Sequence, residues 1–443
     1  MNKDLTTGNV ARTMLAFAGP MIVGNLLQQC YNIADTLIVG KYLGADALAA
    51  VGSAYTLMTF LTSILIGLCM GSGAVFSLQY GRRDLRSLRK SLVVSFGFTG
   101  GIAVVLSALA LLLVDVILKV MQVPAEITGM MREYVWIVFW GIFFVFLYNF
   151  FAYLLRALGN SFVPLCFLGI SAVLNIGLDL LFVMRFEWEI AGAAAATVAA
   201  QCFSGVGIGI YTWFHEKSLR PGRKQLRVER ETVSEIVRFS TASCIQQSVM
   251  NFGILMIQGL VNSFGPAVMA AFAAAVKIDS FAYMPAQEFG NAFSLFISQN
   301  HGAGKGERVK EGTRAAIRIS VLFCLIISAA VFVSAASLMQ IFVRASETEI
   351  IAKGVCYLRI EGACYCGIGV LFLLYGYFRG IGKPEMSIVL TVISLGTRVL
   401  LAYLLAPIPP IGEIGIWCAI PIGWILADLT GVLCIRKESR QGG

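Results

Sequence analysis

Long apolar runs separated by short polar segments make up almost the whole chain. A transmembrane helix needs about 20 consecutive apolar residues, and the pattern predicts twelve such helices. Their expected positions are 11–39, 46–80, 88–114, 131–155, 161–184, 190–214, 236–262, 266–299, 314–340, 350–378, 385–407 and 413–435. We expect the first run to be interrupted near Gly19-Pro20, because proline removes a helix hydrogen bond. These two residues are candidate hinge positions.

The longest polar stretch, 215–235, separates six predicted helices from six. We therefore predict an N-terminal six-helix bundle at 1–214, a cytoplasmic linker at 215–235 and a C-terminal six-helix bundle at 236–443. The halves share sequence motifs: Gly44-Ala-Asp-Ala-Leu-Ala matches Gly265-Pro-Ala-Val-Met-Ala, and Arg156-Ala-Leu-Gly matches Arg379-Gly-Ile-Gly. Because each half crosses the membrane an even number of times, the two repeats are parallel. Parallel repeats are a transporter architecture.

Composition supports an all-α integral membrane protein. The chain is 58% hydrophobic and 13% charged, whereas soluble domains carry about 25% charged residues. The net charge of +9 invites a nucleic-acid partner, but the positive charges lie in short segments between apolar runs. Most of the 34 lysines and arginines fall on one side of the predicted topology, which is then the cytoplasmic side. We expect a multi-pass protein of the cell membrane with both termini in the cytoplasm and no nucleic-acid partner.

The sequence signatures of enzymes and metal centres are absent. The chain has no P-loop, no His-Glu-x-x-His motif and no nucleophile elbow, so we expect neither an enzyme nor an ATP-driven pump. Most of the 11 cysteines stand alone in apolar runs, where a thiol behaves as a small hydrophobic group. We expect no cofactor and no cleavable signal peptide, and we expect the protein to be a monomer.

Four polar residues within apolar runs form the candidate site: Asp35, Asn175, Asp179 and Thr197. A charged side chain at the centre of a membrane helix costs roughly 2.5–3.5 kcal/mol, so an aspartate there indicates function. Asn175 lies four residues before Asp179 and therefore on the same helical face. The helical rise places all four residues about 8–14 Å below the outer surface, where they could share one pocket.

All four side chains offer oxygen atoms, which suit a hard cation. Two neighbouring carboxylates in a low dielectric also favour holding a proton, so the pocket could bind either Na⁺ or H⁺. A purely structural alternative stays open at this point. In that alternative Asp35 caps a helix end, while Asn175 and Asp179 form hydrogen bonds that join neighbouring helices.

The second half does not repeat this set, because Asn175 and Asp179 correspond to Arg398 and Ala402. It carries five other charged residues in apolar runs: Lys277, Asp279, Glu288, Glu361 and Arg398. We expect ion pairing among these five, either lining a cavity or only joining packed helices.

Several motifs together resemble the multidrug and toxic compound extrusion (MATE) family over nearly the whole chain. They are Leu5-Thr-Thr-Gly8-Asn9, Tyr31-Asn-Ile-Ala-Asp35-Thr36, Gly44-Ala-Asp-Ala-Leu-Ala-Ala, Arg156-Ala-Leu-Gly-Asn160, the Asn175–Asp179 pair and Asn300-His-Gly-Ala-Gly-Lys305. The resemblance implies a two-bundle exporter that works by alternating access. Such an exporter exchanges small cationic, amphipathic organic compounds for Na⁺ or H⁺, with membrane lipids around it.

The chain resembles the DinF-like branch, whose N-terminal bundle carries a site of two Asp, one Asn and one Thr. These positions match Asp35, Asn175, Asp179 and Thr197. The NorM-like branch uses acidic residues in the seventh and tenth helices, where this chain has Met250 and Ile368. That second site is therefore expected to be absent.

Two other functions stay open. A flippase for lipid-linked precursors or polysaccharides would share the two-bundle fold but would need a strongly cationic cavity, and only Lys277 and Arg398 place positive charge inside apolar runs. A non-transporting structural or receptor protein would have no need of paired bundles with buried carboxylates.

Overall fold

The computed structural model describes residues 3–121, 123–220, 222 and 229–441, so the middle of the predicted linker lies outside the described residues. The chain forms two compact units. The first unit joins Met1–Leu5 to Gly19–Cys244, and the second joins Thr6–Ala18 to Ile245–Gly443. Two helices, α1 (Val10–Tyr42) and α8 (Arg230–Asn262), are therefore each divided between the units. The predicted division at 215–235 stays a prediction.

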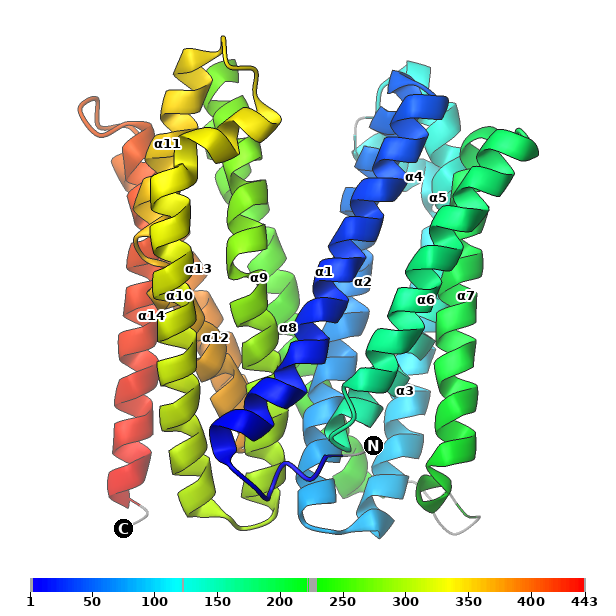
Figure 1. Ribbon diagram of the computed structural model, residues 1–443, viewed down its shortest axis with the longest axis vertical. Coiled ribbons are helices and arrows are strands. Elements are labelled where there is room, and N and C mark those ends of the chain that lie inside the picture. Colours follow the sequence, from blue (N-terminus) through cyan, green and yellow to red (C-terminus); the bar gives the residue numbers. More distant parts are fainter. Residues whose placement is uncertain (1–2, 122, 221, 223–228, 442–443) are drawn as a thin grey trace. The chain divides into compact units, whose positions relative to one another are not determined.

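Both units are built from helices that run alongside one another (Figure 1). Besides its parts of α1 and α8, the first unit contains α2 (Ala45–Gly81), α3 (Leu85–Leu112), α4 (Val114–Val120), α5 (Ala125–Ala157), α6 (Phe162–Asp179), the π-helix η1 (Leu180–Arg185), α7 (Glu189–His215) and the 3-10 helix η2 (Lys217–Leu219). The second unit contains α9 (Pro266–Gly302), α10 (Gly306–Phe342), α11 (Thr348–Gly362), α12 (Tyr365–Gly380), α13 (Glu385–Leu405) and α14 (Glu413–Gln441).

The predicted all-α membrane fold is confirmed. Among the described residues, eleven helices are long and apolar enough to span a membrane, and the bent pair α11 and α12 is long and apolar enough only when the two helices are taken together. The bend of 51° falls at Ala363-Cys364, where the sequence predicted one unbroken helix.

The prediction that the first helix is interrupted near Gly19-Pro20 is wrong. Helix α1 continues through Gly19 and has Pro20 in its interior. Membrane helices tolerate proline where neighbouring groups satisfy the freed carbonyl. The division between the two compact units nevertheless falls between Ala18 and Gly19. The hinge at these positions stays a prediction.

The internal repeat is visible in matching elements. Helices α1 and α8 have 33 residues each, and α2 and α9 have 37 residues each. The helices α2 and α9 both follow a glycine with positive φ, 88° at Gly44 and 95° at Gly265. Glycine adopts this backbone conformation without steric cost, so the same turn chemistry begins the second helix of each half.

A second pair of equivalent turns gives a stability prediction. Gly159 and Gly382 have φ of 85° and 89°. A Cβ at Gly159 would lie 1.9 Å from the carbonyl oxygen of Lys3, whereas a Cβ at Gly382 would meet nothing within 4 Å. We expect Gly382→Ala to cost about 1–2 kcal/mol through backbone strain and Gly159→Ala roughly 1–3 kcal/mol more through the clash. Thermal unfolding in detergent measures the stability of both variants. Equal losses of stability in the two variants would contradict this account.

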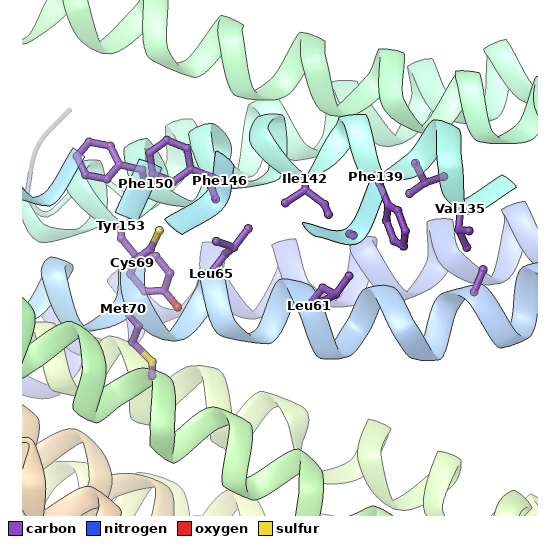
Figure 2. Close-up of a cluster of buried hydrophobic side chains, with 14 of the residues drawn as sticks. Leu61, Leu65, Cys69, Met70, Val135, Phe139, Ile142, Phe146, Phe150 and Tyr153 are labelled. Carbon is purple, nitrogen blue, oxygen red and sulfur yellow. The ribbon is translucent and has the colours of Figure 1, made fainter. Parts of the chain in front are cut away.

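The core of the first unit lies between α2 and α5. Leu61 and Leu65 of α2 face Phe139 and Ile142 of α5 (Figure 2). Leu65, Phe139 and Ile142 are fully buried, and Leu61 is nearly so. Further along α5, Phe146 packs in the same cluster. Helix α5 also packs against α3 and α7, so it joins several helices of the first unit.

Helix α2 also makes an unusually close contact with the start of α8. A Cβ on Gly71 would lie 2.2 Å from the carbonyl oxygen of Phe239. Beside this contact, the hydroxyl groups of Ser72 and Ser240 are 2.9 Å apart, and Ser95 of α3 donates to Ser72 Oγ at 2.6 Å. Small residues that allow backbone contact and buried hydroxyl bonds are how membrane helices associate.

Candidate functional site

The structure brings together the four polar residues that the sequence singled out in the first half. Asp35 comes from α1, Asn175 and Asp179 from the last turns of α6, and Thr197 from α7. All four are buried; Asn175 is 1% exposed and Asp179 is fully buried. We call this set (Asp35, Asn175, Asp179 and Thr197) the N-terminal pocket. It lies entirely within the first compact unit.

Hydrogen bonding in the N-terminal pocket is incomplete. Asn175 Nδ2 donates to Thr197 Oγ1 at 3.4 Å, and the carboxyl groups of Asp35 and Asp179 lie close to each other. Two ionised carboxylates are both acceptors, so this contact is favourable only with a proton or a cation between them. Both oxygens of Asp179 and one of Asp35 have no donor among the described residues.

The two carboxylates have no salt-bridge partner in the described part of the chain. No described lysine or arginine pairs with Asp35 or Asp179. The Oδ1 atom of Asn175 is also buried without a donor. The pocket thus offers several unused oxygen atoms and net negative charge, which suits H⁺ or an alkali cation. The described residues contain no cluster of three His, Cys, Asp or Glu that could hold a metal ion.

Two tyrosines complete the surroundings of the N-terminal pocket. The hydroxyl of Tyr134 on α5 lies near Thr197 and near both carboxylates. Tyr31 lies one turn before Asp35 on α1 and within electrostatic reach of Asp179. Neither residue was predicted to belong to the pocket. The four-residue spacing from Asp35 could have indicated Tyr31, but no sequence signal connects Tyr134 to helices α1, α6 and α7.

The helix that carries Asp179 changes its winding directly after that residue. Helix α6 ends at Asp179, and the π-helix η1 begins at Leu180. π-Helical turns are rare and occur frequently at functional sites, since they re-aim side chains and leave the regular i→i−4 ladder. The π-helical turn directly after Asp179 is therefore consistent with a functional role for this residue.

In the second unit, three of the five predicted charged residues come together. Asp279 of α9 and Glu361 of α11 are buried close to each other and to Tyr357. Tyr365 of α12 also lies near Asp279, but its hydroxyl is buried without a hydrogen-bond partner among the described residues. Arg398 of α13 attracts both acids at longer range, but its Nε atom has no hydrogen-bond partner. The expected direct pairing of Arg398 with these acids is therefore not formed.

The other two predicted residues lie elsewhere in this unit. Lys277 is exposed, because it stands two residues from Asp279 and so points to another side of α9. Glu288 accepts a hydrogen bond from Asn291 Nδ2 at 3.3 Å. They do not belong to the cluster of Asp279, Glu361 and Arg398.

Comparison with known proteins decides the family. A model of the MatE family matches the chain twice, at residues 20–181 and 242–404. The chain belongs to the MATE family of transporters. The two matches fall one in each half of this MATE protein, as the internal repeat requires.

Relatives of this MATE protein match it over most of their length. The probable multidrug resistance protein YpnP of Bacillus subtilis (strain 168) is 32% identical over 393 residues, which cover 88% of this chain and 87% of YpnP. The probable multidrug resistance protein NorM of Thermotoga maritima is 25% identical over 417 residues, covering 92% and 88%. A solved structure of an outward-facing multidrug resistance MATE family transporter aligns with a TM-score of 0.91 at 23% identity, covering 98% and 97%. This structural likeness establishes the fold.

The MATE protein also carries one intramembrane acid that the sequence analysis missed. Asp428 lies in α14, and its Oδ1 atom is buried without a hydrogen-bond partner. Its other oxygen would lie 3.8 Å from a Cβ at Gly367 of α12. Asp428 could have been identified from the sequence, because it is the single aspartate in the apolar run 413–435. An aspartate in an apolar run was also the reason for selecting Asp179.

Arg398 gives a second stability prediction for this MATE protein. Its removal leaves the buried acids Asp279 and Glu361 without a compensating positive charge. We expect Arg398→Gln to lower stability by on the order of 2 kcal/mol, and Lys277→Gln to have little effect because Lys277 is exposed. Thermal unfolding of the purified variants in detergent measures both. Indistinguishable unfolding of the two variants would show that Arg398 does not stabilise the acids.

Proposed function

We propose that this MATE protein is a secondary active multidrug exporter of the cell membrane, with both termini in the cytoplasm. It exchanges cationic, amphipathic compounds for H⁺ or Na⁺, and the coupling ion binds in the N-terminal pocket. The observation that carries the proposal is the buried pair Asp35 and Asp179. Three of their four carboxyl oxygens have no donor among the described residues, and no described lysine or arginine forms a salt bridge with either residue. The two relatives YpnP and NorM are probable multidrug resistance proteins, which supports export of several compounds.

The coupling ion acts by neutralising the N-terminal pocket. In the unloaded pocket the charges of Asp35 and Asp179 repel each other, so separation of α1 and α6 lowers the electrostatic energy. A bound H⁺ or Na⁺ removes this repulsion and allows the two helices to approach. A ligand shifts a conformational equilibrium only by its differential affinity for the two states. Helix α1 carries Asp35 in the first unit and begins in the second unit, with the division at Ala18 and Gly19. Repacking of α1 at Gly19-Pro20 is therefore the step by which ion binding alters drug affinity.

Transport with one imposed gradient at a time tests this function. Ethidium is added outside everted vesicles that contain the protein, and its uptake is followed while a pH gradient or a Na⁺ gradient is imposed separately. We expect one of the two gradients to drive ethidium transport, and that gradient identifies the coupling ion. Vesicles that move ethidium equally well without either gradient would contradict secondary active exchange, and vesicles that move none under both would contradict export of organic cations.

A further inference from the structure

A shallow apolar groove lies on helices α3, α5 and α7 of the first unit. Its volume is ≈350 Å³, and its lining comprises Phe96, Leu147, Phe151, Gly205, Val206, Gly209, Ile210, Trp213 and Phe214. Two glycines of α7 allow close approach to α5, because a Cβ on Gly205 would lie 2.5 Å from the carbonyl oxygen of Phe144. The groove is therefore a product of helix packing rather than of a chance side-chain arrangement.

The side chains beside the groove face a hydrocarbon environment. Ile210, Trp213 and Phe214 of the spanning helix α7 are 54%, 54% and 59% exposed. Opposite them, Phe96 and Phe151 line the groove with ring centroids 6.3 Å apart. An acyl chain fits such a surface, since all contacts are apolar.

Two arginines stand at the end of the groove where α7 ends. The Arg220 guanidinium carbon lies 5.1 Å from the centroid of the Trp213 ring, and its Nε donates to the Trp213 carbonyl at 2.9 Å. Arg89 Nε donates to the carbonyl oxygen of Ser218 at 2.7 Å, in the same turn. Arg89 precedes Phe96 by seven residues, so it lies on the same face of α3, about 10 Å further along the axis.

Neither guanidinium is neutralised within the described part of the chain. No described carboxylate forms a salt bridge with Arg89 or Arg220, whereas the neighbouring Lys90 pairs with Glu229. The acid of this turn, Glu216, forms no salt bridge with Arg89 or Arg220. Each arginine uses its Nε for a backbone carbonyl, which leaves terminal N–H groups for an anion such as a phosphate.

We propose that this groove is a binding site for an anionic phospholipid of the bilayer. One acyl chain lies along α7 between Phe96 and Trp213, and the phosphate is held by Arg89 and Arg220. Basic pockets beside membrane helices recognise lipid head groups in this way. In the topology proposed above the arginines lie at the cytoplasmic side, so the lipid belongs to the cytoplasmic leaflet. The site involves none of the residues of the N-terminal pocket.

Quenching of Trp213 fluorescence by brominated lipids tests the proposal. Of the 6 tryptophans, a variant retains only Trp213, with phenylalanine at the others, and is reconstituted with brominated phosphatidylglycerol or brominated phosphatidylcholine. Since each basic residue near the surface contributes about fivefold to anionic lipid binding, we expect half-maximal quenching at an at least fivefold lower fraction of phosphatidylglycerol. Arg89→Gln with Arg220→Gln should remove this preference.

Two controls separate a specific site from general attraction to charge. Arg82→Gln with Arg83→Gln removes the same charge from the exposed turn after α2 and should keep the preference. A variant that retains only Trp140, which is 55% exposed on α5 outside the groove, should show none. Equal quenching of Trp213 by the two lipids, or a preference that survives loss of Arg89 and Arg220, would overturn the proposal.

Native mass spectrometry of the unmodified chain gives an independent measurement that does not depend on the tryptophan replacements. The wild-type protein and the Arg82/Arg83 control should retain phosphatidylglycerol, whereas the Arg89/Arg220 variant should lose most of it. Equal retention by all three proteins would contradict the site.

Discussion

Asp179→Asn is expected to abolish gradient-driven drug transport. The substitution keeps the size of the side chain but removes the charge that attracts the coupling ion, in a pocket where Asp179 is fully buried. Coupling free energies between sites of 1–3 kcal/mol correspond to factors of about 5–150, so we expect transport to fall at least about fivefold. Ethidium transport in everted vesicles, normalised to the amount of protein in the membrane, measures the loss.

Asp115→Asn provides the matched control for this prediction. Asp115 belongs to the same unit, but it is exposed and pairs with Arg132 at 2.7 Å on the surface, so its replacement should leave transport near the wild-type level. Asp35→Asn should behave like Asp179→Asn. If both pocket variants reach the membrane and export ethidium as well as wild type does, the pocket is structural and the proposed coupling is wrong.

Gly71→Ala is expected to lower stability strongly, because the new methyl group meets the backbone of another helix. The new Cβ would lie 2.2 Å from the Phe239 carbonyl oxygen and 2.7 Å from Ser240 Cα, and neither is a flexible side-chain end. Helices α2 and α8 must therefore separate, which also breaks the Ser72–Ser240 hydrogen bond. Overpacking of this kind costs roughly 1–3 kcal/mol or more, and the lost buried bond adds about 1 kcal/mol. Thermal unfolding in detergent measures the sum.

Gly52→Ala on the same helix is the control for Gly71→Ala. A Cβ at Gly52 meets nothing within 4 Å, and alanine is the better helix former by about 1 kcal/mol. We expect Gly52→Ala to unfold at or slightly above the wild-type temperature. If Gly71→Ala and Gly52→Ala unfold at the same temperature, the contact between α2 and α8 is looser than described.

The spanning helices could be predicted from the sequence because hydropathy reports directly on contact with lipid. The parallel repeat was equally accessible, since Gly44 and Gly265 begin matching helices in both halves. The break between α11 and α12 could not be predicted in this way. An apolar run looks the same whether its helix is straight or bent, and the break at Ala363-Cys364 depends on which groups can satisfy the freed backbone.

The composition of the N-terminal pocket was partly predictable. Depth along each helix follows from the rise per residue, so Asp35, Asp179 and Thr197 could be placed at one level before the structure was known. Tyr134 could not be placed there, because helix α5 lies beside α7 for reasons of three-dimensional packing that no local spacing records. For the same reason the exposure of Lys277 could not be predicted. Its position in an apolar run does not indicate which side of α9 it occupies.

The central claim is that the N-terminal pocket releases its coupling ion when a drug binds. The most direct test mixes purified protein in weakly buffered detergent with saturating ethidium and measures H⁺ release with a pH indicator and ²²Na⁺ release after preloading. Linkage requires that a drug which displaces the ion be displaced by it in turn, so the wild-type protein should release about one equivalent of one ion, and Asp179→Asn should release none. Equal release by Asp179→Asn, or ethidium binding to wild type without release of either ion, would contradict the account.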